Sequence, residues 1–140
     1  MRRLALRCLL FVSLLLLAGR LGAQTAFPTS EGERMRYDVY IQLPRAYVSG
    51  ICILLREGDS VKGSLFNEFG ITALDFTYCL RKQKIKLHSV MPMMDKWYIR
   101  RVLKKDLRQL MARLQQGETQ YQNERRHITY QLTPAHDTTR

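Results

Sequence analysis

Residues 47–90 read YVSGICILLREGDSVKGSLFNEFGITALDFTYCLRKQKIKLHSV. Apolar segments alternate here with short polar turns that contain Gly or Asn, and both residues tolerate the left-handed backbone of tight turns. The pattern predicts four β-strands, over 47–55, 60–66, 71–80 and 84–87. Connections this short favour pairing of successive strands, so the stretch predicts an antiparallel meander.

Two further segments extend the predicted sheet. Residues 35–41 alternate apolar with polar side chains and predict a strand before the meander, which Pro44 ends. Residues 127–132 alternate in the same way and predict a sixth strand, whereas the polar residues 118–126 predict a loop. We therefore expect a sheet of five or six strands.

One long amphipathic helix is predicted after the meander. Apolar residues recur at three- and four-residue spacing from Trp97 to Leu114, Asp95 is placed to cap the N-terminus, and Gly117 suits the C-terminal turn. The apolar stripe is expected to pack on one face of the sheet and to bury Trp97 with the leucines. The expected fold class is α+β, an antiparallel meander with one helix, in a single domain over residues 35–134.

The N-terminus has the features of a secretory signal peptide over residues 1–23: two arginines, a short apolar run and small residues at the end. An uncleaved anchor is the alternative, although the run is short for a membrane span. Cleavage removes four arginines, so the formal charge falls from +11 to +7. Residues 24–34 are expected to form a flexible leader and residues 135–140 a disordered tail. The protein is expected to be exported, to the periplasm or the cell envelope.

Two cysteines remain after cleavage, Cys52 and Cys79. An exported protein meets an oxidising compartment, but the meander places these residues on strands that a third strand separates, about 9–10 Å apart. A disulfide requires a Cα separation of roughly 4.4–6.8 Å. The sequence therefore predicts two buried free thiols.

Positive charge is concentrated in two segments. Residues 95–113 hold seven basic side chains against Asp95 and Asp106, and residues 81–86 add Arg81, Lys82, Lys84 and Lys86 with no acid. Anionic lipid attracts such segments, whereas ordinary solubility is the alternative reason for a basic helix face. Nucleic acid is not expected, because an exported protein seldom meets it and no binding motif is present. The candidate membrane-surface residues are Arg100, Arg101, Lys104, Lys105 and Arg108.

The sequence holds no recognisable catalytic or metal-binding motif. The three histidines are scattered, the cysteines have no neighbours at metal-ligand spacing, and no Gly-rich loop precedes a helix. Ser89 follows His88, but neighbours on a strand point to opposite faces. Asp75 lies within a predicted strand and has no convergent partner. We therefore predict a non-enzymatic protein without cofactor or metal.

The apolar residues of the meander exceed what one helix is expected to cover. If the helix packs on one face, the other face keeps bulky side chains and forms an apolar concavity suited to a lipid, an acyl chain or a protein partner. In the alternative, the same residues face the helix and form the core, and periodicity does not decide between the two. The candidate ligand-binding residues are Ile51, Ile53, Leu55, Phe66, Leu74, Phe76 and Tyr78.

The segments SGICILL (49–55), LFNEFGI (65–71) and LDF (74–76) resemble strand–turn–strand segments of the LolA/LolB-type lipoprotein carriers. The resemblance implies a bent antiparallel sheet, an apolar half-barrel under helices, that holds lipoprotein acyl chains. The chain is shorter than that fold requires and matches no functional residue of the family. We expect a non-enzymatic envelope protein that binds a lipid, acyl chain or lipoprotein in a sheet concavity near anionic membrane. A structural or protein–protein interaction module of the envelope is the alternative.

Overall fold

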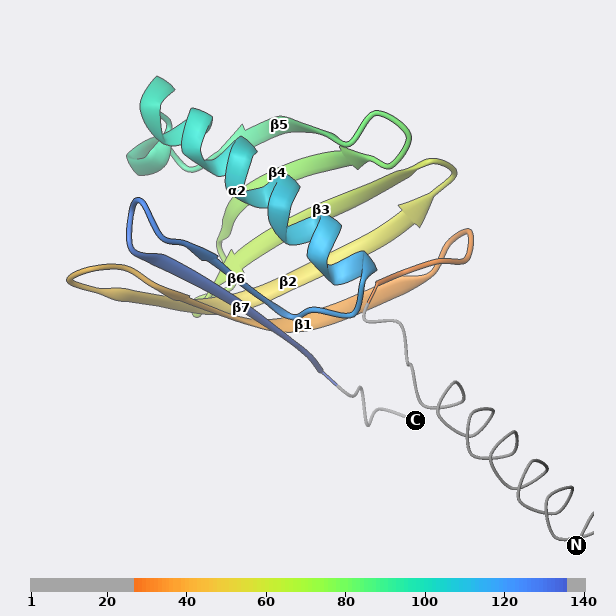
Figure 1. Cartoon of the computed structure of the whole chain (residues 1–140), viewed down its shortest axis with the longest axis horizontal. Helices are drawn as coiled ribbons and strands as arrows, with labels where there is room; N and C mark the ends of the chain where they lie inside the picture. The colour runs from red at the N-terminus through yellow and green to blue at the C-terminus, as the bar shows by residue number, and fades with distance from the viewer. Residues whose placement is uncertain (1–26, 136–140) are drawn as a thin grey trace, which may run out of the picture.

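The computed structural model describes residues 27–135, so the predicted signal peptide and residues 136–140 of the predicted tail lie outside the described residues. The described chain forms one antiparallel sheet and one long helix (Figure 1). The strands are β1 (Arg34–Gln42), β2 (Tyr47–Glu57), β3 (Ser60–Asn67), β4 (Thr72–Cys79), β5 (Lys84–Val90), β6 (Gln120–Asn123) and β7 (Ile128–Pro134). A short 3-10 helix, η1 (Pro92–Met94), precedes helix α2 (Trp97–Gln115).

The strand order is β5-β4-β3-β2-β1-β7-β6. The first five strands form the expected meander, and β7 returns after the helix to pair with β1. The sheet has seven strands, so the prediction of five or six was wrong. The missed strand is β6, at residues 120–123, which were predicted as a loop. This strand is short and polar, so its own sequence does not indicate a strand. Its pairing with β7 holds it in the extended conformation.

The sheet curls around α2 (Figure 1), and the hydrophobic core lies between its concave face and the helix. Leu107, Leu110, Met111 and Leu114 project from one side of α2 and are buried. Three- and four-residue spacing brings these side chains onto one stripe, as expected for a helix with one buried side. The predicted α+β architecture is therefore confirmed in outline.

The C-terminus of α2 ends as the sequence predicts. Gly117 adopts a φ of +85°, the left-handed conformation that glycine reaches without strain. Its N–H donates to the Leu114 carbonyl, and the Glu118 N–H donates to the Arg113 carbonyl. These two bonds are a Schellman motif.

The N-terminus of α2 differs from the prediction. Lys96 occupies the cap position without a side-chain cap, and Asp95 instead pairs with Arg100, Oδ1 to Nε, at 2.5 Å. Trp97 is 75% exposed, so the expectation that it is buried was wrong. The reason is that the first turn of α2 has no sheet beneath it: the first α2 residue packed on the core is Leu103.

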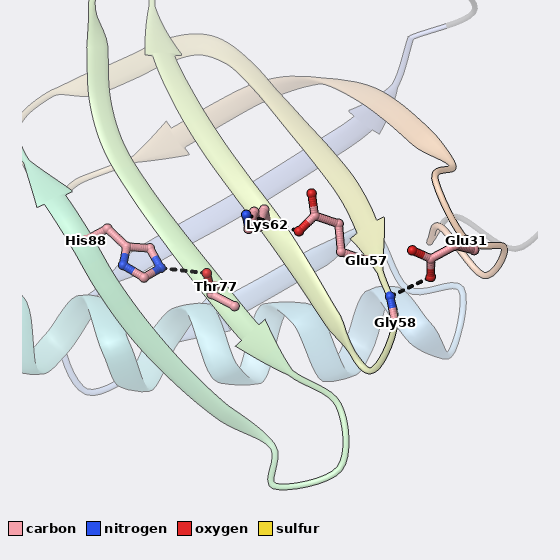
Figure 2. Close-up of polar contacts among 6 residues, drawn as sticks. All are labelled: Glu31, Glu57, Gly58, Lys62, Thr77 and His88. Carbon is pink, nitrogen blue, oxygen red and sulfur yellow. Dashed lines mark hydrogen bonds and ion pairs between the residues drawn. The ribbon is translucent and has the colours of Figure 1, made fainter.

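The cysteines and the predicted leader take definite places in the fold. Both cysteines are free thiols, as predicted from the strand separation, but only Cys52 is buried. Cys79 is half-buried, so the prediction that both are buried was wrong for this residue. Residues 27–33 pack on the domain, although the sequence predicted a flexible leader there. Phe27 joins the core, and the Glu31 carboxylate accepts a hydrogen bond from the Gly58 N–H at 2.5 Å (Figure 2).

Candidate functional site

Three of the candidate ligand-binding residues lie under the helix. Leu74, Phe76 and Tyr78 follow one another on the same face of β4 and are buried against α2. The space left between helix and sheet is about 30 Å³, with a purely apolar lining. That is roughly the share of one molecule in liquid water. These three residues therefore build the core, and the concave face has no room for an acyl chain in this arrangement.

The other four candidates lie on the outer face, which is the face of the sheet turned away from α2. Ile51, Ile53 and Leu55 alternate along β2 with buried residues that face the helix, and Phe66 of β3 stands opposite Ile51. All four are half-buried. The described part of the chain places no helix over this face. The outer face thus keeps apolar side chains that folding does not fully cover. It is the convex face of the curled sheet, so the concavity expected opposite the helix does not form, and α2 fills the concave face instead.

A groove of about 590 Å³ runs over β1, β2 and β3 on this face; we call it the outer groove. Ile51, Ile53 and Phe66 contribute its apolar lining. Pockets for small molecules span roughly 300–1,000 Å³. The outer groove therefore has the volume of a ligand site, in contrast to the space under the helix.

The rim of the outer groove is polar. Arg36 and Asp38 of β1 line one side. On the other side the Ser49 hydroxyl donates a hydrogen bond to the Glu68 carboxylate. An apolar floor beside charged rim groups suits an amphiphile, with hydrocarbon on the floor and a polar head group at the rim.

The remainder of the outer face is polar and internally paired. Figure 2 views this face with α2 behind the sheet. Lys62 of β3 pairs with Glu57 of β2 at 3.0 Å, and the Thr77 hydroxyl lies 2.6 Å from His88 Nε2. These polar side chains form ion pairs or hydrogen bonds with one another. The candidate apolar residues of the outer face lie on the other part of the face, over β1, β2 and β3.

Titratable groups do not converge on the outer groove in a catalytic arrangement. Asp75 accepts one hydrogen bond, from Ser64 at 2.7 Å. Among residues 27–135, no group of three or more His, Cys, Asp or Glu side chains is placed to hold a metal ion. Burial raises the pKa of Cys52 to about 12, and a thiol that stays protonated is a poor nucleophile.

Asp106 is the buried charged residue that the sequence reasoning missed. It is 1% exposed, and its carboxylate accepts hydrogen bonds from the Tyr130 hydroxyl at 2.5 Å and the Asn123 amide at 2.8 Å. Burial and this hydrogen bond raise the pKa of Tyr130. The sequence held a signal, since Asp106 lies three residues after Leu103 and next to Leu107, within the apolar stripe. Its charge led instead to its assignment to the solvent face.

The candidate membrane-surface residues lie along α2. Arg100 is half-buried and pairs with Asp95, whereas the other four are exposed: Arg101, Lys104, Lys105 and Arg108. Within residues 27–135, no helix combines the length and the apolar character needed to span a bilayer.

Comparisons with known proteins give no match: no family model, no curated protein and no solved structure is significantly similar to this chain. The candidate function consequently rests on the geometry of the outer groove and on the charge of α2.

Proposed function

We propose that this protein is a non-enzymatic, exported envelope protein that binds a lipid, an acyl chain or a lipoprotein in the outer groove, near anionic membrane. The observation that carries the proposal is the groove of about 590 Å³ on the uncovered face of the sheet, floored by Ile51, Ile53 and Phe66. Hydrocarbon seated there would remove half-buried apolar surface from water, at roughly 25 cal/mol per Å².

The alternative location, between α2 and the sheet, has less support. Its free volume is about 30 Å³, and Leu110, Met111 and Leu114 already fill the concave face. A ligand there would have to displace the helix from the core. The outer groove requires no such rearrangement.

Binding of a fluorescent dansylated fatty acid tests the proposal. Ile53→Asp places a carboxylate on the apolar floor, directly across from Arg36 of β1. Even when paired with that arginine, the polar group takes the place of apolar contact with the hydrocarbon, so probe binding should weaken at least about tenfold. Thr77→Asp is the matched control, since Thr77 is also half-buried on the outer face but lies outside the groove. The control should bind the probe as the unmodified protein does.

The choice of Ile53 matters for this experiment. Phe76 and Tyr78 are also apolar candidates, but they are buried in the core, so a charge at either position would test folding and not binding. Urea unfolding of each variant confirms that the fold is retained. Probe binding that survives both Ile53→Asp and Phe66→Asp would contradict the groove as the site. Absence of probe binding by the unmodified protein would favour the alternative, a structural or protein–protein interaction module.

A further inference from the structure

Exposed apolar side chains gather at one end of the molecule. In the part of the chain that the structure describes, eight large hydrophobic residues are exposed, and they lie in or beside three connections of the fold: β1–β2, β3–β4 and β5–α2. They are Tyr40, Tyr47, Val48, Phe69, Ile71, Met93, Trp97 and Tyr98.

The strand register brings these connections together. Gln42 at the end of β1 pairs with Tyr47 and also with Thr129 at the start of β7. The β3–β4 turn lies at the same end, because Asn67 pairs with Gly50, near the start of β2. Figure 1 shows the β1–β2 and β6–β7 hairpins and the start of α2 at the left of the view.

We call this end the apolar end, formed by residues 40–48, 68–71, 91–98 and 124–127. The opposite end carries the β2–β3 and β4–β5 turns and the last turn of α2, and it holds none of the eight side chains.

The apolar end is also basic. Lys96 and Arg101 stand beside Trp97 at the start of α2, and Arg125 and Arg126 project from the β6–β7 turn; all four are exposed. Arg45 adds a charge in the β1–β2 turn. Acidic residues here are Glu68, Asp95 and Glu124, and Asp95 is paired with Arg100. Trp and Tyr beside Lys and Arg are the composition of protein segments that lie in a membrane interface.

We propose that the apolar end docks on an anionic phospholipid bilayer, with Phe69, Met93 and Trp97 entering the head-group region. These side chains are 85%, 80% and 75% exposed. The basic residues beside them complement anionic head groups. The aromatic side chains of this end lie in two pairs, Tyr40 with Tyr47 and Trp97 with Tyr98, on separate segments of the fold. Apolar groups distributed in this way suit a fluid interface better than a rigid protein surface. This inference deepens the proposed function, since it places the membrane contact at one end of the molecule.

The outer groove reaches the same end of the molecule. Its lining includes Glu68 and Gly70 of the β3–β4 turn, on either side of Phe69 in the sequence. A molecule docked by the apolar end would hold the mouth of the groove near the bilayer surface. The lipid that the groove is proposed to bind could then enter from the membrane without crossing bulk water.

End-on docking leaves part of α2 away from the bilayer. Lys104 and Lys105 lie seven and eight residues beyond Trp97, which at 1.5 Å per residue is about 10–12 Å along the helix. The Debye length is about 8 Å at physiological salt. These two lysines should therefore contribute less to docking than Lys96 and Arg101.

The fluorescence of Trp97 tests the proposal directly, because it is the only tryptophan of the chain. Vesicles of phosphatidylcholine with about one-third phosphatidylglycerol should shift its emission to the blue, and brominated lipid should quench it. Pure phosphatidylcholine vesicles should bind much more weakly, since the basic residues then lack anionic partners.

Charge reversals provide the matched control. Lys96→Glu with Arg101→Glu, at the apolar end, should lower vesicle binding at least about tenfold. Lys82→Glu with Lys84→Glu makes the same change of charge at the opposite end and should have little effect. All four residues are exposed, so the fold should persist in both variants.

Three results would overturn the proposal: no vesicle binding at physiological salt, bound protein whose Trp97 emission stays unshifted, or equal losses in the two charge-reversed variants. The soluble fatty-acid probe separates this inference from the proposed function. The Lys96→Glu/Arg101→Glu variant should still bind the probe, and Ile53→Asp should still dock on vesicles.

Discussion

At the scale of single residues, Gly63 shows how tightly the core is specified. It stands directly opposite Phe76 in the β3–β4 ladder, and the Phe76 ring lies across it. A Cβ at position 63 would come within 2.2 Å of that ring. The ring is itself fully buried under the helix, so it has no free space into which to move. Glycine at this position is therefore a packing requirement.

Replacing Gly63 tests this reading. Gly63→Ala should lower the free energy of unfolding by about 1–3 kcal/mol, because overpacking forces either the ring or the strand to shift. Lys62→Ala, one residue away and exposed, should change it by no more than about 0.5 kcal/mol. Urea denaturation measures both. Equal stability of Gly63→Ala and the unmodified protein would contradict the packing described here.

At the scale of elements, Asp106 ties α2 to the returning strands. Hydrophobic contacts between the apolar stripe of the helix and the sheet are not directional. The hydrogen bonds of Asp106 are directional, and its carboxylate accepts one from a donor on β7 and one from a donor on β6. Within residues 27–135, no basic side chain forms an ion pair with this carboxylate. Two hydrogen bonds, from Tyr130 and Asn123, take the place of its lost hydration.

Removing this buried carboxylate should destabilise the protein more than replacing an exposed charge of α2. Asp106→Ala removes the acceptor of the buried Tyr130 hydroxyl and of the half-buried Asn123 amide. The unsatisfied Tyr130 hydroxyl alone should lower the free energy of unfolding by about 1–3 kcal/mol. Tyr130→Phe should also destabilise, and the double variant should lose less than the sum of the single losses, because the two side chains share one bond. Lys105→Ala, the exposed neighbour on α2, is the control. Additive losses measured by urea denaturation would exclude the coupling.

At the scale of the whole molecule, one core holds buried tyrosine and cysteine side chains from four strands, and Tyr78 on β4 is one whose pKa burial raises. Tyr37 on β1, Cys52 on β2 and Tyr130 on β7 are all buried, and burial raises the pKa of each. A raised pKa means that the folded state holds the proton when the unfolded state releases it. Stability is then complete below the unfolded pKa values, about 9 to 10, and falls as pH rises above them.

This linkage predicts unfolding at alkaline pH. For Cys52 the loss should extend from about pH 9 to the folded-state pKa of about 12. Cys52→Ala removes that contribution, so its urea midpoint should fall less between pH 8 and pH 10.5 than that of the unmodified protein. Cys79→Ala controls for the replacement of a cysteine on the other face. An identical pH dependence of the unmodified and Cys52→Ala proteins would show that this thiol does not report on folding.

The sequence predicted well wherever local pattern and local geometry coincide. Alternation and turn residues located the five strands of the meander, because side chains of a strand point to its two faces in turn. Gly117 marked the end of α2, since glycine reaches a φ of +85° without strain. The predictions for Trp97 and for β6 were wrong for one reason. Whether Trp97 is buried, and whether β6 finds a strand to pair with, depends on where distant segments of the chain end.

The sequence by itself determined the meander, the long basic helix and the separation of Cys52 from Cys79. Only the tertiary structure decided which sheet face α2 covers, and so divided seven candidate residues into core and groove. It also brought three connections, distant in sequence, to one apolar end. The physical reason is that strand periodicity defines two faces without distinguishing them, and packing of the helix makes that choice.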